Sequence, residues 1–237
     1  MSEPIKIALV SVGSGITGYI IYRLVLKSKR LQQIFETYFG SDRGKSLFIL
    51  FTKYLGCLSI GGLPLLACFS FFPFKGLKDY GLWWNPETGM ETLLWTLGIC
   101  ILVVPIVYIT VKQPRHLVNY PEIRVQTWSY SLLFSYLFSW VVYLFGYELF
   151  FRGILFFPIA DELGLWPAIV INVLVYASAH FPKGRDELVG SIPLSIALCL
   201  LCHYTGTFWI AFFVHVVMGW TNCLTGLKYN KEMKIGG

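Results

Sequence analysis

Seven long apolar segments dominate this sequence and limit the folds that it can adopt. They cover roughly residues 7–26, 46–72, 92–111, 127–160, 163–180, 188–204 and 207–226. An apolar helix of about 20 residues spans a bilayer core of about 30 Å, and lipid-exposed backbone is satisfied only in helices and closed barrels. Charged residues make up only 14% of the chain, too few for a soluble domain of this length. We therefore expect residues 1–237 to form a single all-α integral membrane domain, a polytopic transmembrane helix bundle with about seven spanning helices and a range of six to eight.

The fourth apolar segment is longer than a bilayer requires. Its 34 residues would extend about 51 Å as one continuous helix, well beyond a hydrocarbon core of about 30 Å. The segment is therefore expected to tilt, to break or to project from the membrane. Gly146 is a possible weak point, and a break there would give eight segments.

The loops between these segments alternate in charge. Three basic residues, Lys6, Lys75 and Lys78, lie in one set of loops and the N-terminal tail. Arg23 and Lys53 lie inside segments but nearer their ends, where long basic side chains extend to the headgroups. Cytoplasmic loops are enriched in Lys and Arg, so the charges predict an outside N-terminus, a cytoplasmic C-terminus and an odd number of spans. The other set of loops carries 13 basic residues: Lys27, Lys29, Arg30, Arg43, Lys45, Lys112, Arg115, Arg124, Lys183, Arg185, Lys228, Lys231 and Lys234.

Two short motifs resemble cofactor sites but are better explained by helix packing. Residues 13–18 (GSGITG) match the dinucleotide fingerprint, which requires a βαβ unit that the apolar segments do not supply. Glycines in a membrane helix instead allow a neighbouring helix to approach closely. Residues 199–203 (CLLCH) match the haem-attachment pattern, but they lie inside an apolar helix without a second axial ligand nearby. We therefore expect no cofactor at either motif.

Ionisable residues inside the apolar segments are the candidate functional groups. Such residues are expensive in a membrane unless they are paired or hydrated, and they therefore mark functional sites. Glu148 and Arg152 are four residues apart, so they share a helix face and can pair. His180 ends the next segment, and His215 lies within the last one. Counted from the adjacent turns at about 1.5 Å per residue, Glu148, His180 and His215 fall at compatible depths and can converge on one cavity.

Several kinds of chemistry fit this set of residues. A carboxylate and two imidazoles around a partly dry cavity can activate a water, with Glu148 as the base and a histidine near the developing oxyanion. The same three side chains, Glu148, His180 and His215, could instead hold a divalent metal such as zinc. Two structural interpretations stand beside these: an ion pair of Glu148 with Arg152 that fixes helix packing, and a helix-end role for His180 at the interface.

In this order, the residues resemble the motifs of the CAAX protease and bacteriocin-processing family (CPBP, Abi) of intramembrane proteases. That family carries Glu-Glu-x-x-x-Arg, aromatic-x-x-x-His and His-x-x-x-Asn on successive membrane helices. The corresponding stretches here are Tyr147–Arg152, Tyr176–His180 and His215–Gly219. The resemblance covers roughly residues 127–226, which would form the catalytic core. It implies an all-helical membrane fold that hydrolyses a peptide bond with a glutamate-activated water.

The resemblance also implies a role for each matching residue. Glu148 matches the second motif glutamate, and Arg152 matches its partner. His180 matches the histidine that positions the water, and His215 matches the histidine on the oxyanion side. The expected activity is therefore that of an intramembrane endopeptidase acting on a peptide or membrane-protein substrate, without a cofactor.

Two positions depart from the family pattern. Tyr147 stands where the first motif glutamate is expected, and Gly219 stands where the asparagine is expected, although Asn222 lies one helical turn further on. These departures favour an alternative function, that of a catalytically inactive family member serving as a membrane scaffold, regulator or immunity protein.

A branch of the family with a single motif glutamate carries His-Phe-x-Lys followed by a nearby Glu. Residues 180–183 (HFPK) and Glu187 fit that pattern. Glu187 is thus a candidate to line the cavity mouth, or else a loop carboxylate paired with Lys183 or Arg185. The expected partner besides a substrate is the lipid bilayer, with no nucleic acid, and the expected location is a bacterial plasma membrane.

Overall fold

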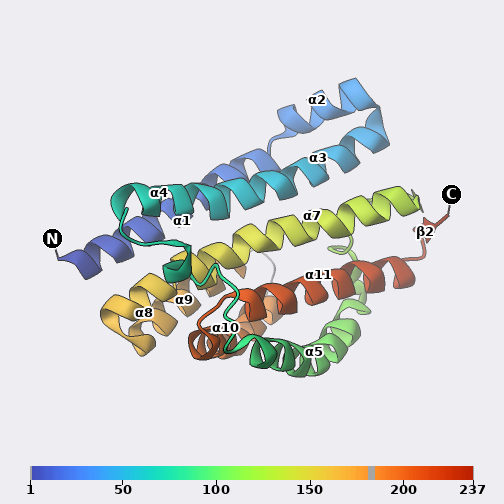
Figure 1. Ribbon diagram of the computed structural model, residues 1–237. Helices are drawn as coiled ribbons and strands as arrows, with labels where there is room; N and C mark the ends of the chain where they lie inside the picture. Colours follow the sequence, from blue (N-terminus) through green and yellow to red (C-terminus); the bar gives the residue numbers. More distant parts are fainter. Residues whose placement is uncertain (1, 181–184, 237) are drawn as a thin grey trace.

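The structure, a computed structural model, describes residues 2–180 and 185–236 (Figure 1). The expected Phe181 and Lys183 of the His-Phe-x-Lys pattern lie outside the described residues, as does the side chain of Arg185. The helices are α1 (Glu3–Leu26), α2 (Lys29–Phe39), α3 (Ser41–Gly56), α4 (Leu63–Phe71), α5 (Gly89–Val111), α6 (Pro114–Leu117), α7 (Tyr130–Glu148), α8 (Phe157–Leu163), α9 (Leu165–His180), α10 (Arg185–Thr205) and α11 (Trp209–Tyr229). Between them lie the π-helical turns η1 (Cys57–Gly62) and η3 (Leu149–Ile154), the 3-10 turn η2 (Leu77–Tyr80), and the strands β1 (Thr127–Trp128) and β2 (Lys234–Ile235).

The apolar segments form the spanning helices that their lengths predict. Six helical segments of the described chain are long and apolar enough to cross a membrane: Glu3–Leu26, Ser41–Phe71, Gly89–Val111, Tyr130–Leu163, Glu187–Thr205 and Trp209–Tyr229. Helix α9 is also apolar but has 16 residues, which extend about 24 Å. The prediction of a polytopic, all-α bundle with six to eight spans is confirmed.

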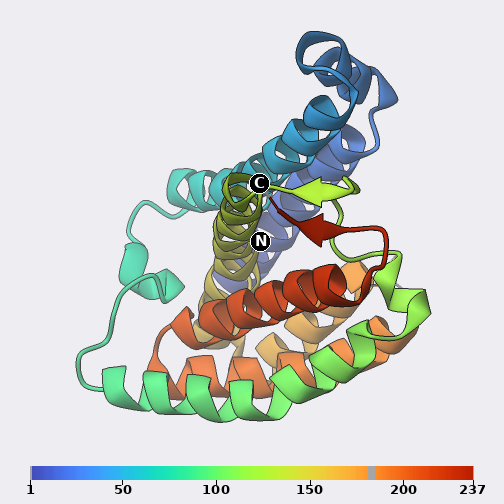
Figure 2. The same cartoon turned by 90° about the vertical axis from the view of Figure 1, so that its right-hand side faces the viewer.

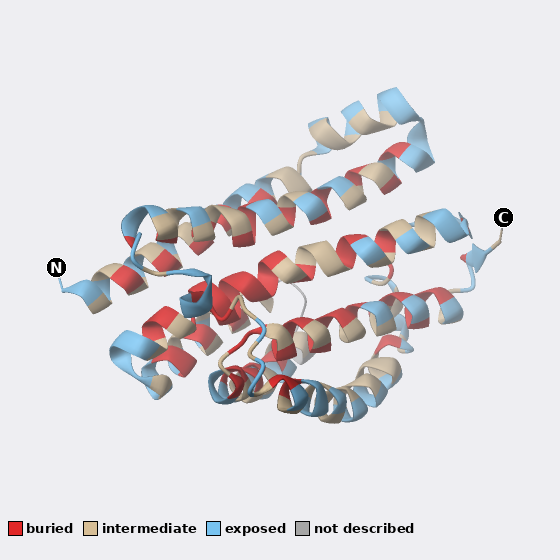
Figure 3. Cartoon of the chain, in the orientation of Figure 1, coloured by how far each residue is buried: buried red, intermediate tan, exposed pale blue. Residues whose placement is uncertain are grey.

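Helix α7 runs through the middle of the bundle. Helices α1, α3 and α4 lie on one side of it, and α5, α10 and α11 lie on the other (Figure 1, Figure 2). Of the apolar windows, 72% of the one in Tyr130–Leu163 and 61% of the one in Trp209–Tyr229 are buried, against 6% in Gly89–Val111 (Figure 3). The segments that contain α7 and α11 therefore form the core, while α5 presents its apolar side chains to the lipid.

The long fourth segment is distorted near its middle, but not at Gly146. Helix α7 continues through Gly146, and the chain then widens into the π-helical turn η3. A Cβ atom at Gly146 would lie 2.5 Å from Cα of Cys57, so α7 contacts η1 backbone to backbone at this point. The chain therefore does not break at this possible weak point, where the glycine instead allows close packing, and the distortion begins three residues later at Leu149.

The glycine-rich motif of residues 13–18 also serves helix packing. It lies inside α1, in a chain whose described residues hold no βαβ unit. A Cβ atom at Gly18 would overlap the carbonyl oxygen of Ser59 in η1, and one at Gly15 would overlap the ring of Phe150. Gly15 and Gly18 therefore allow close packing against η3 and η1, as expected for glycines in a membrane helix, whereas an added Cβ at Gly13 would meet no atom within 4 Å.

Lys53 is placed differently from the expectation. Its side chain is 2% exposed, and its ammonium lies 2.6 Å from a carboxylate oxygen of Glu122. The ammonium also lies 3.6 Å from the ring centroid of Trp140, within range of a cation–π contact. The expectation that Lys53 extends to the headgroups is wrong, because an acidic and an aromatic partner inside the protein stabilise its charge.

The C-terminal tail returns to the beginning of α7. Strands β1 and β2 pair in parallel, with Thr127 opposite Lys234 and Trp128 opposite Ile235. The amide of Lys234 donates to the carbonyl of Gln126 at 2.8 Å. The pair joins the start of α7 to the end of α11. The N-terminus and the C-terminus lie at opposite ends of the bundle (Figure 1).

Candidate active site

A buried ion pair lies where α7 passes into η3. Glu148 is the last residue of α7, Arg152 lies within η3, and both side chains are 0% exposed. Nη1 of Arg152 lies 3.1 Å from Oε2 of Glu148 and 3.4 Å from its Oε1. The four-residue spacing therefore does bring the two charges together. Leaving either charge alone at this depth would be strongly unfavourable, so each requires the other.

His215 connects this ion pair to α11. Its Nδ1 lies 2.9 Å from Oε1 of Glu148 and 3.1 Å from the carbonyl oxygen of Ala211. Both neighbours are acceptors, so Nδ1 carries the hydrogen, and in the neutral imidazole Nε2 is then the acceptor. Nε2 lies 2.9 Å from the hydroxyl of Tyr176, which can donate to it. Glu148 thus fixes both the tautomer and the orientation of the His215 ring.

Tyr176 on α9 contacts Arg152, His180 and His215. Its ring centroid lies 4.4 Å from the guanidinium carbon of Arg152 and 4.5 Å from the ring centroid of His180. His180 is the last residue of α9, and its Nδ1 lies 3.0 Å from the carbonyl oxygen of Tyr176. Tyr176 therefore joins the two predicted histidines, since His215 binds its hydroxyl and His180 stacks on its ring.

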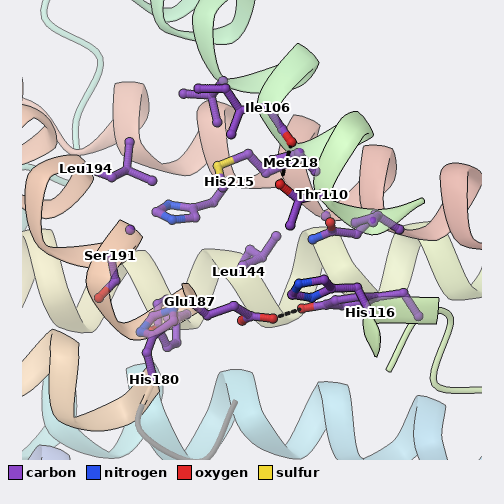
Figure 4. A pocket seen from close by; sticks show the side chains of 18 of the residues that line it. Ile106, Thr110, His116, Leu144, His180, Glu187, Ser191, Leu194, His215 and Met218 are labelled. Carbon is purple, nitrogen blue, oxygen red and sulfur yellow. Dashed lines mark hydrogen bonds between the residues drawn. The ribbon is translucent and has the colours of Figure 1, made fainter. Parts of the chain in front are cut away.

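A cavity of about 520 Å³ opens beside these residues (Figure 4). Its lining is largely apolar and comes mainly from α5, α7, α10 and α11, with His180, Glu187 and His215 among the polar residues that surround it. Glu148 has no exposed surface and is not among the lining residues. The carboxylate therefore lies behind the cavity wall, and His215 stands between it and the interior of the cavity.

The other predicted residues also lie at this cavity. Tyr147, Gly219 and Asn222 line it, so the two positions that depart from the family pattern face the same space as His215. The Tyr147 ring packs on that of Phe151, with centroids 4.6 Å apart. Glu187 lines the cavity and accepts a hydrogen bond from the Tyr120 hydroxyl at 3.3 Å. Burial and the negative charge of Glu187 raise the pKa of Tyr120 well above its usual value.

Two buried polar residues near Arg152 were missed by the sequence analysis. Nη2 of Arg152 donates to Oγ of Ser195 on α10 at 3.4 Å, and that hydroxyl donates to Oδ1 of Asn172 on α9 at 3.2 Å. Both residues stand out in the sequence as polar groups inside apolar helices. Asn172 lies one helical turn before Tyr176 and two before His180, a spacing that places the three on one face.

The geometry does not favour the alternative metal site. In the two described stretches of chain, no three His, Cys, Asp or Glu side chains come close enough together to hold a metal ion. His215 directs Nδ1 at Glu148 and Nε2 at the Tyr176 hydroxyl, so both ring nitrogens already have partners. A zinc ligand needs one ring nitrogen directed at the metal.

The fold and the site together define a polytopic helical membrane protein whose buried ionisable residues gather at one internal cavity. Residues 128–221 match the family model described as type II CAAX prenyl endopeptidase Rce1-like. This match agrees with the resemblance to the CAAX protease family, and the matched residues include Glu148, Arg152, His180 and His215. No curated protein and no solved structure matches the chain.

Proposed function

We propose that the chain is an intramembrane endopeptidase of the CAAX type, which cleaves a peptide or a membrane protein at the internal cavity. The observation that carries the proposal is the series of contacts from Glu148 through His215 to Tyr176, which leads from the buried ion pair to the cavity wall. The family model supports the proposal because it describes prenyl endopeptidases. The apolar lining suits a substrate that reaches the site from the bilayer.

The proposed reaction begins with the attack of a water in the cavity on the carbonyl carbon of the scissile peptide. Nε2 of His215 accepts the proton of that water, directly or through the Tyr176 hydroxyl, and Glu148 stabilises the imidazolium that forms. His180, which lines the same cavity, is assigned the donation of a hydrogen bond to the developing oxyanion. The imidazolium then gives its proton to the leaving nitrogen, so that the products are a carboxylate and an amine.

This scheme exchanges the roles that the family resemblance implies for His180 and His215, and it assigns the first proton transfer to His215, whereas the resemblance implies Glu148. The reason is burial: His215 lines the cavity, while Glu148 is 0% exposed behind it. Glu148 remains essential in either scheme: in one it is itself the base, and in the other its negative charge makes the imidazole a better base.

The test uses purified protein in liposomes and a farnesylated peptide that ends in a CAAX sequence, with cleavage followed by mass spectrometry. Glu148→Gln, His180→Ala and His215→Ala should each lower kcat by about 100-fold or more. Gly13→Ala is the control, since an added Cβ there meets no atom within 4 Å. Unchanged turnover in folded Glu148→Gln would contradict the proposed mechanism.

A second candidate function, that of an inactive scaffold, regulator or immunity protein, is favoured by Tyr147 and Gly219. An added Cβ at Gly219 would lie 3.4 Å from Cδ1 of Leu144, which is ordinary van der Waals contact, so a side chain can begin at this position without a backbone clash. If the wild type leaves a panel of peptides intact and Tyr147→Glu with Gly219→Asn creates cleavage, the scaffold function is supported. A binding partner retained by Glu148→Ala would point the same way.

Metal-assisted hydrolysis, the third candidate, has a direct test. The protein is washed with a chelator, its metal content is measured by elemental analysis, and its turnover is compared with that of untreated protein. Full activity without bound metal removes this candidate, whereas loss of activity that zinc restores supports it.

The proposed orientation places the N-terminus outside and the C-terminus in the cytoplasm. It is supported by the uneven distribution of basic residues between the two sets of loops. Helix α2, which begins at Lys29, lies at the same end of the bundle as the C-terminus (Figure 1). Fusions of alkaline phosphatase and of a fluorescent protein to the C-terminus, expressed in bacteria, test the orientation: only the fluorescent fusion should be active.

A further inference from the structure

A series of buried hydrogen bonds starts at Arg152, the partner of Glu148, and returns to the backbone of the preceding residue, so that it forms a closed ring. From Arg152 it runs to the hydroxyl of Ser195 at 3.4 Å and from there to Oδ1 of Asn172 at 3.2 Å. Nδ2 of Asn172 donates to the carbonyl oxygen of Phe151, the residue before Arg152. The side chains of Arg152, Ser195 and Asn172 are all 0% exposed. The ring therefore joins η3 to α9 and α10 without contact with solvent.

The last hydrogen bond of the ring, from Asn172, reaches the backbone of the π-helical turn η3. In η3 the amide of Leu155 donates to the carbonyl of Phe150, five residues earlier, at 2.8 Å. The next carbonyl, that of Phe151, accepts from Asn172. π-Helical turns of this kind occur often at functional sites. Here the side chain of Asn172 stabilises the turn that contains Arg152.

The ring also determines how Arg152 can hold Glu148. The guanidinium group is a rigid, planar fork, so fixing Nη2 on Ser195 fixes the direction of Nη1. Nη1 is the atom that lies 3.1 Å from Glu148 Oε2. Glu148 in turn must keep Oε1 within 2.9 Å of His215 Nδ1. If the guanidinium moved, the carboxylate of Glu148 would move with it, and so would the imidazole of His215.

We propose that Asn172 and Ser195 are positioning residues of the proposed peptidase site. They hold Arg152, and through it Glu148, in the place where the carboxylate meets His215. Neither residue lines the cavity, so they act on the site from behind its wall. The inference rests on the proposed function for its consequence in catalysis, but its geometric part can be tested without any substrate.

The geometric test uses infrared difference spectroscopy of the protein in liposomes. The carboxylate stretch of Glu148 is identified as the band that disappears in Glu148→Gln. Ser195→Ala and Asn172→Ala should both shift this band, because the guanidinium is no longer fixed against the carboxylate. The matched control is Ser139→Ala, which removes a hydroxyl that is also 0% exposed but donates at 2.7 Å to the Tyr136 carbonyl of its own helix. An unmoved band in Ser195→Ala overturns the inference, even if Asn172→Ala does not fold.

The kinetic test uses the farnesylated CAAX peptide. Ser195→Ala should lower kcat by about tenfold or more, since small displacements of catalytic groups are costly, and should leave KM within about twofold. A purely packing role would reduce the amount of folded protein and leave kcat per folded molecule unchanged, which would overturn the inference. If the wild type does not cleave the peptide, the proposed function fails, and the infrared result alone decides whether Ser195 and Asn172 position Glu148.

Discussion

Nδ1 of His215 on α11 lies 2.9 Å from a carboxylate oxygen of Glu148 on α7, so the central contact of the site joins the two most buried segments of the bundle. An imidazole held at Nδ1 by a carboxylate keeps Nε2 available for proton exchange. In this chain Nε2 is directed at the Tyr176 hydroxyl, beside the cavity. The chemistry of the site therefore depends on how closely α7 and α11 pack.

Tyr176→Phe separates the two roles that the Tyr176 hydroxyl can have. The variant keeps the ring that contacts His180 and Arg152 and removes the hydrogen bond to His215. If the hydroxyl only orients the imidazole, kcat should fall by about tenfold at most, the value of one hydrogen bond. A loss of about 100-fold or more would show that the hydroxyl carries the proton. Steady-state cleavage of the farnesylated peptide measures the difference, and an unchanged kcat would exclude both roles.

Removing one partner of the Glu148–Arg152 pair should be more damaging than removing both. Arg152→Met leaves a carboxylate with 0% exposure without its strongest partner, and breaking a buried pair costs about 3–5 kcal/mol. Glu148→Gln combined with Arg152→Met should recover part of the lost Tm, because no uncompensated charge remains. Thermal unfolding in detergent compares the two variants. A double variant with a lower Tm than Arg152→Met would argue against a charge effect.

Removing one partner of the Lys53–Glu122 pair should likewise lower the Tm. Glu122→Gln removes the carboxylate that lies 2.6 Å from an ammonium that is 2% exposed, and the Tm should fall. Lys53→Met removes the charge and keeps much of the side-chain volume, so its Tm should fall less. Equal Tm values for the two variants would indicate that the ion pair contributes little to stability.

Gly18→Ala tests the contact between α1 and η1. The new Cβ would overlap the carbonyl oxygen of Ser59, a backbone atom that cannot rotate away, and overpacking of this kind costs about 1–3 kcal/mol. Gly13→Ala is the matched control in the same helix, because its Cβ would meet no atom within 4 Å. Alanine at position 13 should be neutral or slightly stabilising. The same Tm for both variants would mean that α1 and η1 can separate without cost.

Much of the fold could be predicted because a bilayer imposes length and polarity on every span. The Glu148–Arg152 pair could be predicted as well, since it depends on local helical spacing. The contact of Glu148 with His215 joins residues 67 positions apart, and the sequence shows only that their depths agree. The contact between Nδ1 of His215 and Oε1 of Glu148 depends on how α7 and α11 are rotated about their axes. This rotation follows from side-chain packing and not from the spacing of residues in the sequence.

Sequence patterns do not predict a residue's position where contacts with distant parts of the chain decide it. Lys53 lies near the end of an apolar segment, and its burial depends on Glu122, which lies in the loop between α6 and β1. Glycine is a residue at which a helix can break, but the backbone of η1 packs against Gly146, and α7 stays helical there. Asn172 and Ser195 carried a readable signal as polar residues in apolar helices, whereas the π-helical turn that they stabilise left no signal in the sequence.

The short parallel pairing of β1 with β2 has a mechanical consequence for the site. It fastens the first turn of α7 to the tail of α11 at a point 20 residues before Glu148, which is about 30 Å along the helix. The two core helices are thus joined near one end of the bundle by the strand pair and again further along by the contact of Glu148 with His215. Two contacts along their length prevent α7 and α11 from sliding past each other. Strand β2 therefore preserves the alignment of the Glu148 carboxylate with the His215 imidazole, although it lies far from both.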